Sequence, residues 1–181
     1  NKSSVDDFGF IDMLIDDLLL TYNIDSTRIY ATGFSNGADM SFTLGCYLQN
    51  KIAAIAPVSG LMVHNPSASC TLSFPIGAMI IHGTSDNSRP IDGIEGYYAS
   101  INETIEFLAS QNGMLLNPSV TDYISDGLTI ELYSYPNQEN KIYLEYYKVI
   151  DGDHYWLNIG RNGLETNQMI WNFLSRFSSN T

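Results

Sequence analysis

Apolar positions recur along the chain in blocks whose spacing predicts helices and strands in turn. In the first block, Phe8, Ile11, Ile15 and Leu18 follow one another at intervals of three or four residues. This spacing is typical of one face of an amphipathic helix, which we expect to run from about Val5 to Tyr22. The block therefore predicts a helix that packs one side against the rest of the protein.

Later blocks predict a layered arrangement of strands and helices. Continuous apolar runs at 53–58 and 78–81 are typical of strands buried on both faces. Buried strands that alternate with helices indicate an α/β fold, a mostly parallel sheet with helices on both faces. We expect one domain over residues 1–181. The other expected elements are strands at 28–32, 128–133 and 141–149, helices at 36–48, 96–111 and 166–177, and a loop at 60–74.

Composition and charge exclude several classes of protein. The 181 residues include 8 Lys and Arg against 20 Asp and Glu, a net charge of −12. A protein that binds nucleic acid needs a basic face to displace counterions, and eight scattered cations do not form one, so we expect no nucleic-acid partner. We also expect no membrane span, since no apolar run reaches the roughly 20 residues that a spanning helix needs.

The two cysteines, Cys46 and Cys70, leave two interpretations open. They are too few for a disulfide scaffold and do not have the spacing of a metal knuckle. They could form one disulfide in an exported protein, or remain two inert buried thiols.

The segment 33–37 reads Gly-Phe-Ser-Asn-Gly, a G-x-S-x-G pattern between an expected strand and an expected helix. This context predicts a nucleophile elbow, in which a sharp turn exposes the Ser35 hydroxyl above the sheet. Small residues two positions before and after the serine let the backbones pass closely. The backbone N–H of Asn36 would then stabilise an oxyanion. The alternative is an ordinary tight turn with a serine N-cap.

A serine nucleophile needs a base, which is normally a histidine. We favour His154, because it lies just past the last expected strand, in a loop before the final helix. His64 lies in the Ser- and Pro-rich loop and is expected to be a surface residue. His82 ends a buried strand and is expected to hydrogen-bond the loop that follows it.

The third member of such a site is an acid that orients the histidine. Asp86 directly follows a buried strand, and its place between the serine and the histidine gives the chain order of the α/β-hydrolases. Asp92 is the reserve candidate, with a turn or helix cap as its other role. Asp151 and Asp153 are expected to form a turn beside His154. They do not predict a metal site, since no second cluster of ligands completes a shell.

With these residues, the sequence resembles the polyhydroxybutyrate depolymerase and feruloyl esterase family of α/β-hydrolases. The similar segments include RIYATGFSNGADM, IAAIAPVSG, IIHGTSD and DGDHYW, and they extend over most of the chain. The resemblance implies an α/β-hydrolase fold with Ser35 as nucleophile, Asp86 as acid and His154 as base. This chain departs from the family pattern at Asp39 and at Tyr155-Trp156-Leu157, so we expect its acyl pocket to differ in shape from the family's while the triad is retained.

The resemblance also implies strands before the first expected helix that these residues do not contain, together with a glycine-rich loop that donates a second oxyanion hydrogen bond. An apolar sheet edge would otherwise be left open at the strand 28–32. We therefore expect a cleaved or truncated chain, a second chain or copy that covers this edge, or a small hydrolase with rebuilt oxyanion donors.

These inferences predict a serine carboxylic-ester hydrolase that needs no metal or organic cofactor. From the resemblance, its substrate is a small-molecule or polymer ester with a short acyl or hydroxycinnamoyl group, and the protein is secreted or periplasmic. Leu61, Tyr155 and Trp156 are candidates for the substrate pocket, although core packing is the more favoured role for each. The alternatives are an inactive binding domain derived from a hydrolase and a serine peptidase of the same fold.

Overall fold

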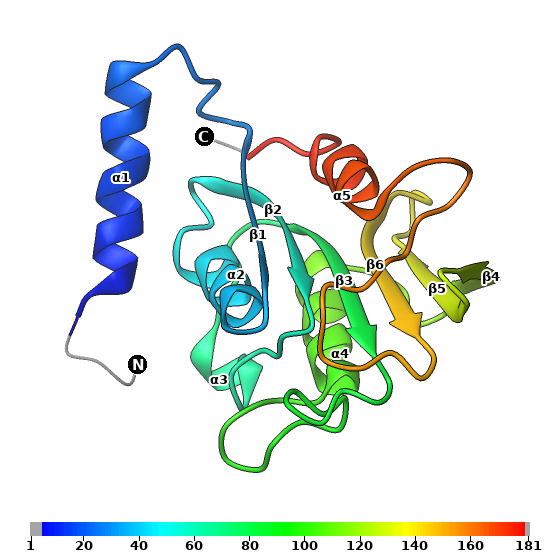
Figure 1. Cartoon of the computed structure of the whole chain (residues 1–181). Helices are drawn as coiled ribbons and strands as arrows, with labels where there is room; N and C mark the ends of the chain where they lie inside the picture. Colours follow the sequence, from blue (N-terminus) through cyan, green and yellow to red (C-terminus); the bar gives the residue numbers. More distant parts are fainter. Residues whose placement is uncertain (1–4, 180–181) are drawn as a thin grey trace.

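The computed structural model describes residues 5–179, which form a six-stranded sheet with helices on both faces (Figure 1). The elements in chain order are α1 (Asp7–Thr21), β1 (Ile29–Phe34), α2 (Asn36–Tyr47), β2 (Ile52–Val58), α3 (Pro66–Ser69), β3 (Gly77–Gly83), α4 (Ile101–Asn112), β4 (Ser119–Ser125), β5 (Leu128–Pro136), β6 (Ile142–Val149) and α5 (Thr166–Leu174).

The sheet has the strand order β1-β2-β3-β6-β5-β4. The pairs β1–β2, β2–β3 and β3–β6 are parallel, whereas β6–β5 and β5–β4 are antiparallel. The parallel strands all end at one edge of the sheet, at the bottom of Figure 1. Loops that leave this edge can therefore bring residues from distant parts of the sequence together. The expected α/β-hydrolase architecture is confirmed.

The core lies on both sides of the two central parallel strands. Every residue of β2 and β3 is buried, as their continuous apolar runs predict. Alternate residues face opposite layers: Ile55 and Ile80 pack with α2 and α4, while Ala56 and Ile81 pack with α5. Because both faces are covered by helices, the central strands form a rigid base for the loops at the carboxyl edge.

Helix α4 begins at Ile101 rather than at the expected residue 96. Ser100 is its N-cap and forms a capping box with Glu103, each side chain bonding the backbone of the other. Tyr98 forms β-bridges instead of entering a helix, and Tyr97, which lies inside the expected helix, is 74% exposed. Apolar residues continue at helical spacing on the N-terminal side of Ile101, but the helix begins only after the Ser100 cap.

Two other elements differ from the sequence prediction. The expected loop 60–74 contains the short helix α3, which begins with a proline at its first position. The strand β4 was not predicted, because its residues are mostly polar and exposed. It is held by its antiparallel register with β5 rather than by burial.

Helix α1 lies along one side of the molecule and has no fully buried residue. Phe8, Ile11 and Ile15 are partly buried against the core, as expected, while Phe10 and Met13 are more than half exposed. Within the described residues, the adjacent edge strand β1 pairs only with β2. The second chain or copy at this edge therefore stays a prediction. None of the helices within residues 5–179 is long and apolar enough to cross a membrane.

Cys46 and Cys70 form a disulfide, so the first of the two interpretations of the cysteines is the one that the structure contains. The bond joins the end of α2 to the segment that follows α3. It therefore fixes the loop after β2 to the helix that begins at the G-x-S-x-G segment.

Candidate active site

The G-x-S-x-G segment forms the sharp turn between β1 and α2 that the sequence predicts. Ser35 has φ 55° and ψ −119°, a backbone conformation that non-glycine residues rarely adopt and that costs about 1–3 kcal/mol. Its backbone N–H donates to the Val58 carbonyl at 3.0 Å, which ties the turn to the end of β2. Ser35 occupies the N-cap position of α2, but its side chain makes no capping hydrogen bond.

The two glycines of the turn have different roles. A Cβ added to Gly33 would lie 2.6 Å from the backbone of Gly37, so Gly33 must lack a side chain for the chain to cross itself here. A Cβ on Gly37 would meet nothing within 4 Å among the described atoms. The expectation that small residues are needed on both sides therefore holds on steric grounds for Gly33 alone.

The turn that follows β3 holds Asp86, whose side chain is fully buried. Its Oδ1 accepts hydrogen bonds from the backbone N–H groups of Ser88 at 2.9 Å and Arg89 at 2.7 Å. These bonds fix the plane of the carboxylate and leave Oδ2 directed toward His154. Two backbone donors of its own turn thus orient the carboxylate.

The loop that holds His154 follows β6 and is joined to the Asp86 turn by backbone contacts. A Cβ on Gly83 would lie 2.2 Å from the Gly152 carbonyl oxygen, so the two segments cross in close contact. The Ser85 N–H donates to that same carbonyl at 2.9 Å, and the Asp151 N–H donates to the Thr84 hydroxyl at 2.8 Å. The loops that hold the acid and the histidine are therefore fixed to each other.

His154 connects the serine to the acid. Its Nδ1 lies 2.8 Å from Asp86 Oδ2, and its Nε2 lies 2.9 Å from Ser35 Oγ. A carboxylate only accepts hydrogen bonds, so Nδ1 carries the proton and the Nε2 lone pair is left to accept one from the hydroxyl. The imidazole also packs against the Phe34 ring, with centroids 4.9 Å apart. This arrangement can remove a proton from the hydroxyl and hold the resulting imidazolium beside the carboxylate.

The Asn36 N–H is placed to stabilise negative charge near the serine. Asn36 is the first residue of α2, where backbone N–H groups have no partner inside the helix and the helix dipole favours anions. No residue of 5–179 accepts a hydrogen bond from this N–H. It remains the predicted oxyanion donor, and a second donor stays unassigned.

Two of the other titratable candidates, His82 and Asp153, have structural roles. His82 is fully buried and its Nε2 donates to the Arg89 carbonyl at 2.7 Å, as expected for a residue that holds the following loop. Burial lowers the pKa of His82, because the protein interior disfavours the charged imidazolium. Asp153 accepts from the His154 N–H at 2.7 Å and so forms the expected turn. Histidine 154 pairs with Asp86 and not with the reserve candidate, Asp92.

The three candidate pocket residues lie in different surroundings. Leu61 is fully buried in the core, which matches the core-packing role favoured for it. Tyr155 and Trp156 are 44% and 41% exposed. Trp156 lines a mostly apolar hollow of about 240 Å³, together with Trp171 and neighbouring side chains of α5. Tyr155 and Trp156 remain predicted pocket residues.

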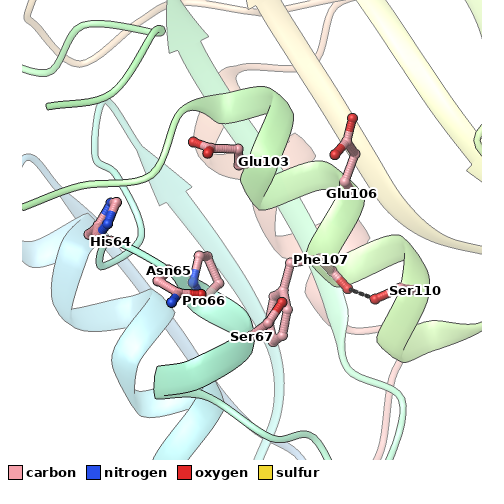
Figure 2. Close-up of a pocket in the computed structure, with 8 residues that line it drawn as sticks. All are labelled: His64, Asn65, Pro66, Ser67, Glu103, Glu106, Phe107 and Ser110. Atoms are coloured by element: carbon pink, nitrogen blue, oxygen red, sulfur yellow. Dashed lines mark hydrogen bonds between the residues drawn. The ribbon is translucent and has the colours of Figure 1, made fainter. Parts of the chain in front are cut away.

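One hollow in the surface is separate from the histidine, serine and acid described above. It has a volume of about 500 Å³ and lies between α3 and α4 (Figure 2). The side chains of His64, Glu103 and Glu106 point in different directions around it, and Glu103 is engaged in the helix cap. Within the described residues, no group of three or more His, Cys, Asp or Glu side chains could hold a metal ion.

Two residues that contact the site have no signature in the sequence. Phe34 supports the imidazole, but the second position of G-x-S-x-G accepts any residue and so carries no signal. Arg89 donates to Asp86 through its backbone N–H. Every residue except proline has such a group, so the residue type at this position gives no signal. Its place three residues after the acid was the one indication available.

Comparison with known sequences identifies the family. The profile of the phospholipase/carboxylesterase family matches residues 5–107. A bifunctional acetylxylan esterase/xylanase from Neocallimastix patriciarum is 31% identical over 134 residues, which cover 74% of this chain and 17% of that protein. Feruloyl esterase D from Neurospora crassa is 33% identical over 81 residues, covering 45% of this chain and 27% of the relative. The matched segments thus span less than a third of the length of each relative.

Solved structures share the fold at low sequence identity. An acetyl xylan esterase from Aspergillus awamori aligns with a TM-score of 0.64 and 15% identity, over 92% of this chain and 66% of that one. The esterase PE8 aligns with a TM-score of 0.57 and 18% identity, over 91% and 58%. These two likenesses establish the fold, and the match of the family profile over more than half of the residues goes further: the chain belongs to the phospholipase/carboxylesterase family.

Proposed function

We propose that the protein is a serine carboxylic-ester hydrolase that works through an acyl-serine intermediate. The observation that carries this proposal is the pair of contacts made by His154, 2.9 Å to Ser35 and 2.8 Å to Asp86. A hydroxyl is a weak nucleophile unless an adjacent base takes its proton. The strained backbone of Ser35 supports the same interpretation, since strain of this kind is retained at functional sites.

The reaction proceeds in two halves. Ser35 Oγ attacks the ester carbonyl carbon while His154 Nε2 takes the hydroxyl proton, and Asp86 stabilises the imidazolium. The Asn36 N–H binds the oxyanion of the tetrahedral intermediate. The intermediate collapses when the imidazolium gives its proton to the leaving alcohol. Water, activated by the same imidazole, then hydrolyses the acyl-serine and restores the hydroxyl.

The substrate class follows from the relatives. Several are named feruloyl esterases and one is named an acetylxylan esterase/xylanase. We therefore propose an ester of a short acyl or hydroxycinnamoyl acid, on a sugar or a polymer. The protein acts in a secreted or periplasmic location, a proposal that the disulfide supports because such bonds persist in oxidising compartments.

Covalent labelling by a fluorophosphonate tests the proposal. The reagent phosphonylates a serine only when its base is in place, so we expect one adduct on Ser35 of the wild type and none on Ser35→Ala. Within residues 5–179 the Ser35 hydroxyl makes no hydrogen bond other than the one to His154, so Ser35→Ala should melt at nearly the same temperature. A folded wild-type protein that is not labelled would contradict the proposal and favour an inactive binding domain.

A second assay separates the ester hydrolase from a peptidase of the same fold. We expect p-nitrophenyl acetate to be turned over faster than an aminoacyl anilide. Faster turnover of the anilide would overturn the assignment of the substrate class while leaving the serine mechanism intact.

A further inference from the structure

An ion pair beside the candidate active site joins two of its loops. Arg89 donates to Asp39 Oδ2 from Nη2 at 2.8 Å and from Nε at 3.1 Å. The side chains are 19% and 16% exposed, so solvent screens the pair only partly. The hydrogen bonds to Asp39 raise the pKa of the Arg89 guanidinium, which keeps it charged.

The remaining hydrogen-bonding capacity of Asp39 is used by the protein itself. Its Oδ1 accepts from the Leu61 N–H at 2.9 Å, and its Oδ2 accepts from the Tyr98 hydroxyl at 3.1 Å. The Arg89 guanidinium also lies over the Tyr98 ring, 5.1 Å from its centroid. Since both carboxylate oxygens are already engaged, the pair is built to hold loops together rather than to bind substrate.

Each partner of the ion pair is connected to a different member of the candidate triad. The backbone N–H of Asp39 donates to the Ser35 carbonyl at 3.0 Å, in the first turn of α2. The backbone N–H of Arg89 donates to Asp86 Oδ1 at 2.7 Å. The Arg89 carbonyl accepts from buried His82 at 2.7 Å. Arg89 is thus fixed at its N–H, its carbonyl and its side chain.

We propose that the Asp39–Arg89 ion pair positions the triad: it holds the turn whose backbone orients Asp86 at a fixed place relative to the helix that begins at Ser35. Both are positioning residues, and the inference rests on the function proposed above. When the pair is lost, the Asp86 turn keeps its backbone bonds and the bond from His82 but loses its link to α2, and the carboxylate moves relative to His154. A displacement of about 1 Å at a reacting site can cost about a hundredfold in rate.

The test compares single variants of the pair with their double variant, using p-nitrophenyl acetate. We expect Arg89→Ala and Asp39→Asn each to lower kcat about 10- to 100-fold with KM changed less than about twofold, because the chemistry is misaligned and binding is not. The double variant Asp39→Asn/Arg89→Ala should be no slower than the slower single variant, since both act through one interaction. Arg89→Lys should recover part of kcat.

A control removes an ion pair of similar exposure that makes no hydrogen bond to the triad or to the Asp39–Arg89 pair. Lys148 and Glu131 are 29% and 27% exposed and lie 3.0 Å apart on β6 and β5. We expect Lys148→Ala to leave kcat within about twofold of the wild type. Asp39→Asn keeps the shape of the side chain, so it tests the inference even if Arg89→Ala does not fold.

Several results would overturn the inference. These are an unchanged kcat in both variants, a rise in KM alone, which would indicate substrate contact, or an equal loss of kcat in Lys148→Ala. Fluorophosphonate labelling of the wild type distinguishes the two proposals. A labelled wild type with unaffected pair variants contradicts only the positioning role, whereas an unlabelled wild type contradicts the proposed function.

Discussion

The carboxyl edge of the parallel strands and the antiparallel hairpin β4–β5 are stabilised in different ways. At the carboxyl edge of the parallel strands, loops from β1, β3 and β6 cross at distances that leave no room for a side chain at Gly33 or Gly83. The antiparallel hairpin β4–β5 is held by a regular register, and its outer strand is exposed at most positions. Val120 and Ile124 there are 52% and 67% exposed.

This difference indicates in which region a substitution should affect activity. In the hairpin, backbone hydrogen bonds fix the structure, so exposed side chains can be exchanged at little cost. At the carboxyl edge, the backbone approach itself places Ser35, Asp86 and His154 within hydrogen-bonding reach. Changes there should alter activity by much more than changes of the same chemistry in the hairpin.

The largest expected contrast comes from replacing an aspartate by asparagine once at the carboxyl edge and once in the hairpin. Asp86→Asn replaces the acceptor of the His154 Nδ1 proton with an amide that can stabilise the wrong tautomer, so we expect kcat to fall by about 10⁴. Asp122→Asn, on exposed β4, should change kcat less than about twofold. Steady-state hydrolysis of p-nitrophenyl acetate measures both. Comparable rates for the two variants would remove Asp86 from the mechanism.

The disulfide separates stability from catalysis. It closes a loop of 24 residues, and in the chain-entropy account such a crosslink contributes about 3 kcal/mol to the free energy of unfolding. Cys46→Ala/Cys70→Ala should therefore lose about that much stability in urea while kcat changes little at 25 °C, because neither cysteine contacts the site. If kcat falls in proportion to stability, the carboxyl edge is not independently fixed by its own crossings.

The two glycines of the serine turn form a matched pair. Gly33→Ala places a methyl group against the Gly37 backbone, and overpacking of this kind costs about 1–3 kcal/mol. We expect a drop of that size in the free energy of unfolding and a large loss of kcat, because Ser35 must move. Gly37→Ala meets open space and should be milder in both measurements. The reverse order would contradict the crossing described here.

The smallest expected effect is a pH dependence of stability that arises from His82. Burial lowers its pKa below the ordinary value of 6.5, so below that pH the unfolded chain binds a proton that the folded protein resists. The unfolding free energy should therefore fall as pH drops below about 6.5. His82→Gln retains a donor toward the Arg89 carbonyl and does not titrate, so its curve should be flatter. Parallel curves in urea titrations between pH 8 and pH 5 would rule out this contribution.

Much of the architecture could be predicted from the pattern of apolar residues. The buried runs that form β2 and β3 and the strand-turn-helix around Ser35 have strong local signals. Strand β4 had none, because register with a neighbour and not burial defines it. The start of α4 depended on the Ser100 cap, which a continuing apolar periodicity concealed.

The candidate site divides in the same way. Ser35, Asp86 and His154 could be chosen because residue type, chain order and position after a strand all point to them, and the structure brings them together. The Asp39–Arg89 pair could not be predicted, since it joins residues 50 positions apart and depends on how two loops pack. Catalytic side chains have a chemical signature in the sequence, whereas the contacts that position them arise only in the folded chain.

The most direct test of the central claim is the mass of the intact protein after it has been mixed with p-nitrophenyl acetate and quenched in acid within the first turnover. We predict one acetyl group on the wild type, mapped to Ser35 by peptide sequencing, and none on Ser35→Ala. An acetyl group on another residue, or equal acetylation of Ser35→Ala, would contradict the account.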